Sequence, residues 1–256
     1  YFRKFDCVIG DEAHLFKAKS LTSIMTKLHQ CKYRYGLTGT LDDTQTHRLV
    51  LEGLFGPVKD VVSTKELIDK KTLANLKIKC ILLKHQAKRE RLTYQEELDY
   101  LVSNEKRNVF LVNLLNHLNG NTLCLFQLVE KHGKVLYDKM KDKENAFFIY
   151  GKTETEERER IRALVDKSTN STIIASFGVF STGINIRNIH NIVLASPSKS
   201  KIRVLQSIGR GLRTSSTKDS VLVFDIGDDM SYRGRKNFTL NHFAERINIY
   251  NQQQFN

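Results

Sequence analysis

The segment FDCVIGDEAH, residues 5–14, joins an apolar run to two adjacent carboxylates and a histidine. Residues 5–10 predict a buried strand, and Asp11 and Glu12 follow at its end. We expect a helix at residues 19–28 and a short strand at 33–37 that ends in Thr38-Gly39-Thr40. Strands that alternate with helices and end in polar turns are typical of parallel α/β sheets. Ligands bind such sheets at the carboxyl ends of the strands, where both polar clusters are predicted to lie.

The same alternation continues along the chain. It predicts helices at residues 63–70, 109–118, 134–140 and 154–167, and strands at 76–83, 123–127, 146–150, 172–176, 191–195 and 221–226. Residues 84–108 are very polar and carry both signs of charge, which is typical of a connection. The sequence therefore predicts an α/β fold of doubly wound parallel sheets, divided at 1–83, 84–108 and 109–256.

The composition argues against a membrane-spanning, zinc-binding or disulfide-rich protein. Of 256 residues, 40% are hydrophobic, enough for a core at this size, and no apolar run is long enough to span a bilayer. The 41 Lys and Arg against 28 Asp and Glu give a net charge of +13, which points toward a polyanion such as nucleic acid; the alternative is a merely basic soluble protein. The four cysteines are far apart, so we expect reduced thiols in the cytoplasm (a host cytoplasm if the protein is viral) and neither a zinc site nor disulfides.

The adjacent carboxylates at the end of the first strand suit nucleotide hydrolysis. One can hold Mg²⁺, directly or through water, while its neighbour orients and deprotonates the attacking water. The alternative is a solvated loop that happens to contain two acids. The apolar strand that delivers Asp11 and Glu12 to the sheet edge favours the first interpretation.

Four segments, in this order, resemble motifs of the DEAH-box type of superfamily 2 helicases. They are Asp11-Glu12-Ala13-His14 (motif II), Thr38-Gly39-Thr40 (motif III), Ser181-Thr182-Gly183-Ile184-Asn185 (motif V) and Gln206-Ser207-Ile208-Gly209-Arg210-Gly211-Leu212-Arg213 (motif VI). The resemblance implies RecA-like sheets: the end of a first motor lobe, followed by a complete second lobe. It also implies ATP and Mg²⁺ as cofactors.

The resemblance further implies roles for the first two motifs. Asp11 would bind Mg²⁺, Glu12 would act as the catalytic base, and His14 would couple the ATP site to the lobes. Thr38, Gly39 and Thr40 would transmit the nucleotide state.

Motif VI places two arginines three positions apart, on one face of a helix. Guanidinium groups suit phosphate oxygens, and the resemblance implies that Arg210 and Arg213 face the γ-phosphate while Gln206 organises the cleft. The alternative is that the arginines bind surface acids or nucleic-acid phosphates.

In motif V, Gly183 leaves room for a close backbone approach and Asn185 can bind a ribose hydroxyl. Ser181 and Thr182 can contact phosphates of a DNA strand. The alternative for these two hydroxyls is an ordinary helix start with capping side chains.

Two further clusters are ambiguous. Arg233, Arg235 and Lys236 form a basic group that can contact a DNA backbone or simply face solvent. Thr153 and Glu156 have the spacing of a capping box, which favours a structural role.

One motif of the family is missing. The sequence contains no G-x-x-x-x-G-K-[ST] phosphate-binding loop, so we expect the chain by itself to bind ATP poorly and hydrolyse it negligibly. We interpret it as a piece of a longer enzyme, an ATP-dependent DNA helicase or translocase in recombination, repair or branched-DNA processing, acting as a monomer. The alternatives are a restriction-type translocase or repair helicase subunit, and a non-catalytic nucleic-acid-binding module.

Overall fold

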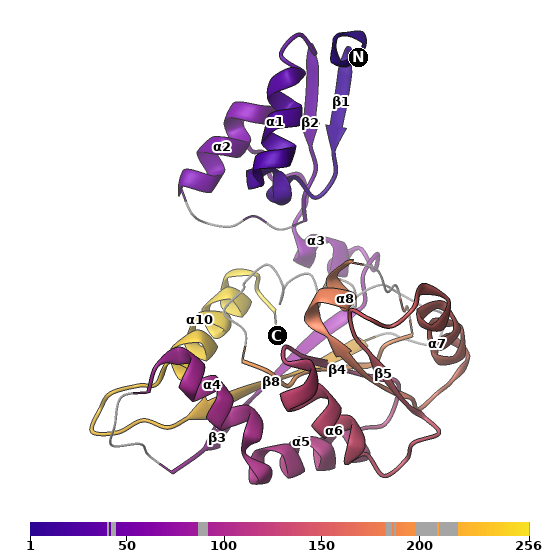
Figure 1. Cartoon of the computed structure of the whole chain (residues 1–256), viewed down its shortest axis with the longest axis vertical. Helices are drawn as coiled ribbons and strands as arrows, with labels where there is room; N and C mark the ends of the chain where they lie inside the picture. The colour runs from indigo at the N-terminus through magenta and orange to yellow at the C-terminus, as the bar shows by residue number, and fades with distance from the viewer. Residues whose placement is uncertain are drawn as a thin grey trace. The chain divides into compact units, whose positions relative to one another are not determined.

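The computed structural model describes residues 1–39, 41, 45–86, 92–182, 186, 188–197, 209 and 220–255. The chain divides into two compact units, Tyr1–Val62 and Ser63–Asn256. Figure 1 shows a two-stranded parallel sheet with helices in the first unit and a larger sheet in the second. The parallel α/β fold expected from the sequence is therefore confirmed.

The first unit is built on two short parallel strands. They are paired in register from Cys7↔Tyr33 to Gly10↔Gly36. Its elements are η1 (Phe2–Lys4), β1 (Cys7–Gly10), η2 (Ala13–Lys17), α1 (Lys19–Lys27), β2 (Tyr33–Gly36) and α2 (Gln45–Phe55). Its core is small: Met25, Leu28, Cys31 and Leu54 pack together with Val8, Phe16 and Phe55.

The glycines that end both strands let two aromatic rings approach the sheet. A Cβ atom on Gly10 would lie 2.9 Å from Cζ of Phe16, and one on Gly36 would lie 2.9 Å from Cγ of Phe55. The two rings pack edge to face at a centroid distance of 5.1 Å. This close contact fixes the ends of β1 and β2, where the polar motifs begin.

The second unit contains a six-stranded parallel sheet of order β3-β8-β7-β4-β6-β5. Its strands are β3 (Asn75–Lys84), β4 (Thr122–Phe126), β5 (Ala146–Ile149), β6 (Thr172–Ser176), β7 (Asn191–Leu194) and β8 (Ser220–Asp229). The central strands are buried on both faces, which explains why they are continuous apolar runs in the sequence.

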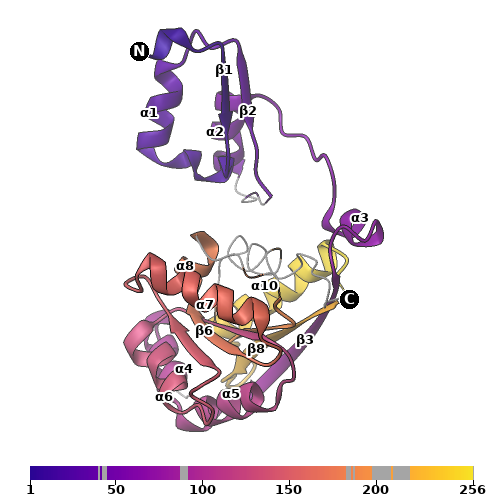
Figure 2. The ribbon, with the colours of Figure 1, turned by 90° about the vertical axis from the view of Figure 1, so that its right-hand side faces the viewer.

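Helices cover both faces of this sheet (Figure 2). They are α3 (Thr64–Asp69), α4 (Tyr94–Ser103), α5 (Glu105–His117), η3 (Val129–Gly133), α6 (Lys134–Asp138), α7 (Thr155–Lys167), α8 (Phe177–Thr182) and α10 (Phe238–Gln252). One core cluster includes side chains of α7, α8 and α10, and the other includes side chains of α5 and α6. Within the described ranges, no helix is both long and apolar enough to cross a membrane.

The boundary between the units differs from the one expected at residue 83. Strand β3 pairs with β8 along its whole length, from Asn75↔Ser220 to Lys84↔Asp229, and so joins the second sheet. Residues 84–108 are also not a plain connection, because they contain α4 and the start of α5. The expected boundaries were wrong because β3 pairs with β8, which lies more than a hundred residues later in the chain. The sequence around β3 does not indicate which distant strand it pairs with.

Two helix starts also differ from expectation. Thr153 does not form a capping box, because the N-cap of α7 is Glu154 and Thr153 Oγ1 instead accepts a hydrogen bond from the Tyr150 amide at 3.0 Å. A true capping box begins α4, where Thr93 Oγ1 accepts from the Glu96 amide and the Glu96 side chain accepts from the Thr93 amide.

Helix α10 is fixed at its start by a buried carboxylate from α4. Glu97 accepts hydrogen bonds from the amides of Phe238 (2.9 Å) and Thr239 (2.6 Å), from the Thr239 hydroxyl and from the Asn237 amide group (2.9 Å). A negative charge at a helix N-terminus is stabilising, and here it satisfies amides that the helix leaves without internal partners.

The same helix is fixed near its end by a buried acid of β8. Arg246 forms a two-pronged ion pair with Asp225, Nε to Oδ2 and Nη2 to Oδ1, both at 2.8 Å. The Tyr250 hydroxyl donates to Asp225 Oδ2 at 2.7 Å. The four-residue spacing of these side chains in the sequence therefore reflects one helix face that binds one carboxylate.

Replacing Glu97 with glutamine is expected to destabilise the second unit by about 2–3 kcal/mol. The carboxamide turns one acceptor into a donor that faces backbone amides, so at least one buried N–H loses its partner. Urea unfolding followed by circular dichroism measures the effect. The matched control is Glu105→Gln, which removes an exposed ion pair with Lys139 and should cost under about 1 kcal/mol. Equal unfolding midpoints for the two variants would contradict the capping role.

Candidate functional site

The two polar motifs of the first unit lie side by side at the carboxyl ends of β1 and β2. The Leu37 amide donates to the Gly10 carbonyl at 2.8 Å, and the Ala13 amide donates to the Leu37 carbonyl at 2.8 Å. These bonds extend the pairing of the two strands into the loops. Asp11-Glu12-Ala13-His14 and Thr38-Gly39 are therefore held against each other, at the edge where parallel sheets bind ligands.

The adjacent carboxylates are held in a turn. Asp11 is exposed, and its Oδ1 accepts a hydrogen bond from the Glu12 amide at 2.8 Å. Glu12 has left-handed backbone angles, φ 49° and ψ 49°, which are uncommon for a residue with a side chain. This turn directs the half-exposed Glu12 carboxylate toward His14, so the two neighbouring acids have different surroundings.

His14 joins the two motifs. Its buried Nδ1 lies 2.9 Å from Thr38 Oγ1 and 3.2 Å from Glu12 Oε2. Because a carboxylate only accepts hydrogen bonds, Nδ1 carries the proton in the arrangement that satisfies both contacts. Burial lowers the pKa of His14; Glu12 raises it, and electrostatic interactions with His47 and Lys17 lower it further. His14 is therefore a neutral link from the acid to the next loop.

The acids fit a magnesium ion that is bound mainly by phosphate. The described residues contain no group of three or more His, Cys, Asp or Glu side chains that could hold a metal ion by themselves. Mg²⁺ in nucleotide sites uses one or two carboxylates together with water and substrate phosphates, so a single exposed Asp11 is the expected donor set. When bound, such an ion neutralises negative charge on the phosphates.

Several candidate residues lie outside the described residues. They are Thr40, Gly183, Asn185, Gln206, Arg210 and Arg213. Ser181 and Thr182 form the last turn of α8, so the backbone there ends a helix and does not begin one.

The basic cluster near the tail lies on an exposed turn between β8 and α10. Tyr232 and Arg235 exchange backbone hydrogen bonds at 3.1 and 3.0 Å around Arg233, at φ 48°, and Gly234, at φ 80°. Arg233, Arg235 and Lys236 are all exposed, and the Arg233 guanidinium stacks over the Tyr232 ring at 5.3 Å. The structure thus leaves these three cations accessible to a polyanion.

A buried ion pair at the carboxyl edge of the six-stranded sheet was not foreseen. Arg107 of α5 binds Asp228 of β8 with two bonds, Nε to Oδ1 at 2.8 Å and Nη2 to Oδ2 at 3.0 Å. Nη2 also donates to the Ala195 carbonyl after β7 at 2.7 Å, and His85 Nε2 donates to Asp228 Oδ1 at 2.8 Å. Burial disfavours the Asp228 charge, but Arg107 and His85 together outweigh it and lower the pKa of Asp228.

The network extends to a third strand through a histidine. His132 is fully buried, and burial together with the nearby Arg107 lowers its pKa to about 3, so it is neutral. Its Nε2 lies 3.5 Å from Arg107 Nη1 and must accept, so Nδ1 donates to Ser196 Oγ at 2.8 Å. Ser196 Oγ also accepts from the Gln127 amide at 3.1 Å. Arg107 thereby connects, directly or through His132 and Ser196, the end of β8 with the segments that follow β4 and β7.

Comparisons with known proteins show which families this chain resembles. Residues 105–215 match the helicase conserved C-terminal domain. UvsW of Enterobacteria phage T4, an ATP-dependent DNA helicase, is 33% identical over 274 residues, which cover 100% of this chain and 54% of UvsW. The crystal structure of T4 UvsW matches all of this chain and 53% of its own, with a TM-score of 0.61. The whole chain is therefore similar to a superfamily 2 helicase, and residues 105–215 match the helicase C-terminal domain.

Other matches have lower sequence identity. Putative helicase 22 of a Sulfolobus islandicus filamentous virus is 26% identical over 238 residues, covering 86% of this chain and 42% of that protein. A fragment structure of a putative type I restriction HsdR subunit from Vibrio vulnificus has a TM-score of 0.66 at 17% identity, over 91% of this chain and 49% of its own. At that identity the likeness shows the fold alone. The chain spans about half the length of UvsW.

Proposed function

We propose that this chain forms part of an ATP-dependent DNA helicase or translocase that processes branched or recombining DNA. The observation that carries the proposal is the contact of His14 with both Glu12 and Thr38. A nucleotide-dependent change at Asp11 and Glu12 would reach the loop of Thr38 through the imidazole of His14. The relation to UvsW, an ATP-dependent DNA helicase, supports the activity.

The residues of the first unit have separate roles in ATP hydrolysis. Asp11 holds Mg²⁺, and Glu12 accepts a proton from the attacking water. His14 stays neutral, and a movement of Glu12 shifts His14 and, through their contact, Thr38. Gly39 and Thr40 transmit this movement. The lowered pKa of His14 supports this role, because a neutral ring does not hold the Glu12 carboxylate in an ion pair when that carboxylate accepts a proton.

The second unit supplies cations and DNA contacts. Arg210 and Arg213 stabilise charge on the γ-phosphate, with Gln206, Gly183 and Asn185 shaping the nucleotide site. The DNA strand contacts Ser181, Thr182 and the exposed Arg233, Arg235 and Lys236. The net charge of +13 supports a polyanionic partner.

An exposed apolar face supports a larger first lobe. The register of β1 and β2 places Cys7, Ile9, Tyr33 and Tyr35 on one face, and Ile9 and Tyr35 are 63% and 53% exposed. Parallel sheets are ordinarily covered on both faces. We propose that a further α/β segment with the missing phosphate-binding loop covers this face and completes the ATP site.

Replacing Glu12 with glutamine is expected to lower the rate of ATP hydrolysis about 10²–10⁴-fold in a helicase-length protein that carries this chain and a phosphate-binding loop. The carboxamide keeps the shape but accepts no proton. DNA-stimulated phosphate release and strand displacement on forked and four-way DNA measure the effect, with Glu52→Gln as a matched acid that pairs with Arg48.

Two results would refute parts of the proposal. Wild-type hydrolysis by the Glu12→Gln protein would remove Glu12 as the base. Robust hydrolysis by the present chain alone would show that the missing phosphate-binding loop is dispensable. A helicase-length protein that binds DNA but never hydrolyses ATP would favour the non-catalytic binding module.

A further inference from the structure

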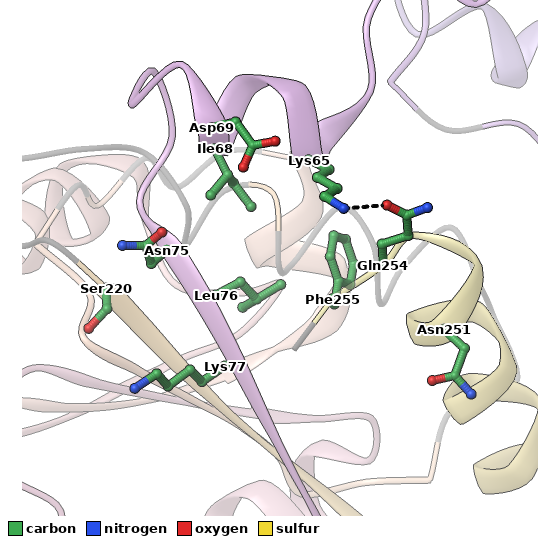
Figure 3. A pocket seen from close by; sticks show the side chains of 10 residues that line it. All are labelled: Lys65, Ile68, Asp69, Asn75, Leu76, Lys77, Ser220, Asn251, Gln254 and Phe255. Carbon is green, nitrogen blue, oxygen red and sulfur yellow. Dashed lines mark hydrogen bonds between the residues drawn. The ribbon is translucent and has the colours of Figure 1, made fainter.

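A hollow of about 860 Å³ lies in the second unit, away from the residues discussed above (Figure 3). It is bounded by α3, by the first residues of β3 and β8, and by the end of α10. Asn75 and Ser220 begin their strands, so the hollow is at the amino edge of the parallel sheet. Residues 11–14, residues 38–39 and the Arg107 network belong to carboxyl ends of strands. The hollow is therefore a separate place on the molecule.

The lining combines apolar and amide side chains. Leu76 and the partly buried ring of Phe255 give apolar surface, and Asn75, Asn251 and Gln254 supply both donors and acceptors. Aromatic and aliphatic surface accepts the face of a nucleobase, while carboxamides can bind its edge. The volume is in the range of sites for ligands of nucleotide size.

The described residues that line the hollow carry a net positive charge. Two lysines, Lys65 and Lys77, and one acid, Asp69, are among its described lining residues, a difference of one positive charge. The Lys65 ammonium donates to the neutral carbonyl of Gln254 at 2.7 Å, so its charge is not neutralised by that partner. Lys70 on the same helix is different, since it pairs with Glu66 at 2.7 Å.

The two lysines point in different directions. In Figure 3, Lys65 extends toward Gln254, whereas Lys77 extends away from it on the other side of β3. A single phosphate between them would not satisfy both ammonium groups. Successive phosphates of a chain that crosses the start of β3 would contact one lysine each, with Phe255 beside the path.

We propose that this hollow binds a segment of single-stranded nucleic acid. Lys65 and Lys77 contact successive phosphates, and a base stacks on Phe255. The site is independent of ATP hydrolysis, because none of its residues belongs to the helicase motifs. Helix α3 is the first element of the second unit, so a bound strand would contact the start of that unit.

The test compares two charge-matched double variants of this chain without ATP. Lys65→Gln/Lys77→Gln removes the proposed contacts, and Lys106→Gln/Lys141→Gln removes two exposed lysines elsewhere in the unit. Fluorescence anisotropy with a labelled oligothymidylate at about 50 and 200 mM salt gives the affinity and its salt dependence. We expect the first variant to bind about tenfold more weakly, with the salt slope reduced by about 1.4, which is about 0.7 per lost phosphate contact.

A third variant separates stacking from charge. Phe255→Leu keeps apolar bulk but removes the ring, and we expect it to weaken binding about fivefold with an unchanged salt slope. Thermal unfolding checks that each variant is folded. The proposal is overturned if Lys65→Gln/Lys77→Gln binds the oligothymidylate within twofold of the control pair. It is also overturned if free AMP or inorganic phosphate displaces the oligothymidylate at concentrations near the dissociation constant of the oligothymidylate. These binding measurements use no ATP, so they are independent of whether a longer protein that carries this chain hydrolyses ATP.

Discussion

The second unit is expected to lose about 3–5 kcal/mol of folding free energy when Arg107 is replaced by methionine. The side chains of Arg107 and Asp228 are both fully buried, and the substitution leaves the carboxylate without its cation. It also removes the hydrogen bond to the Ala195 carbonyl. Methionine fills similar space, so the loss reports charge and hydrogen bonding more than volume. Urea unfolding measured by circular dichroism gives the value.

Two controls make this result specific. Arg160→Met breaks an exposed ion pair with Glu157 and should cost under about 1 kcal/mol. Arg107→Met/Asp228→Asn removes both buried charges and should recover part of the loss. A cost for Arg107→Met as small as that for Arg160→Met would show that the pair contributes little.

The effect also depends on pH. The pKa of Asp228 is lower in the folded protein than in the unfolded chain. Its stabilising contribution is therefore complete above its ordinary pKa of about 3.9 and is lost as the pH falls toward the folded value. The wild type should lose this advantage over Arg107→Met/Asp228→Asn in acid.

Replacing Arg210 with alanine is expected to reduce ATP hydrolysis about 10³–10⁵-fold in a helicase-length protein while DNA binding persists. The guanidinium is proposed to stabilise charge that develops on the γ-phosphate, and alanine supplies none. Phosphate release under saturating DNA measures hydrolysis, and anisotropy with labelled DNA measures binding.

Arg162→Ala is the matched control, since Arg162 is on α7 and pairs with Glu159 at 2.8 Å. Its hydrolysis rate should equal that of the wild type. If Arg210→Ala instead weakened DNA binding and spared hydrolysis, Arg210 would be a contact to nucleic-acid phosphate.

Most strands could be predicted because a buried parallel strand is a continuous apolar run. Thr122–Phe126 and Asn191–Leu194 are of this kind, and the structure has them within one residue of the expected ends. The boundary at residue 83 was wrong because the pairing partner of β3 is far away in the chain. Helix α4 was missed because its sequence is polar and its buried Glu97 looks like a surface charge until Thr239 is seen beside it.

The candidate site was only partly predictable. The order of the motifs indicated that Glu12, His14 and Thr38 act together, and the hydrogen bonds bring them together. No such order indicates Arg107, His132 or Asp228, which come from separate elements and meet only in the folded sheet. A charged residue in a polar stretch is predicted to face solvent, and only a partner in space shows otherwise.

The pairing of β3 with β8 has a consequence for synthesis. Each residue from Asn75 to Lys84 pairs with a residue between Ser220 and Asp229, so this edge of the sheet can close only after residue 229 has left the ribosome. Contacts of such long sequence separation form slowly. Until then Leu76 and Ile78, which pack in the core of the folded unit, remain exposed on the nascent polypeptide.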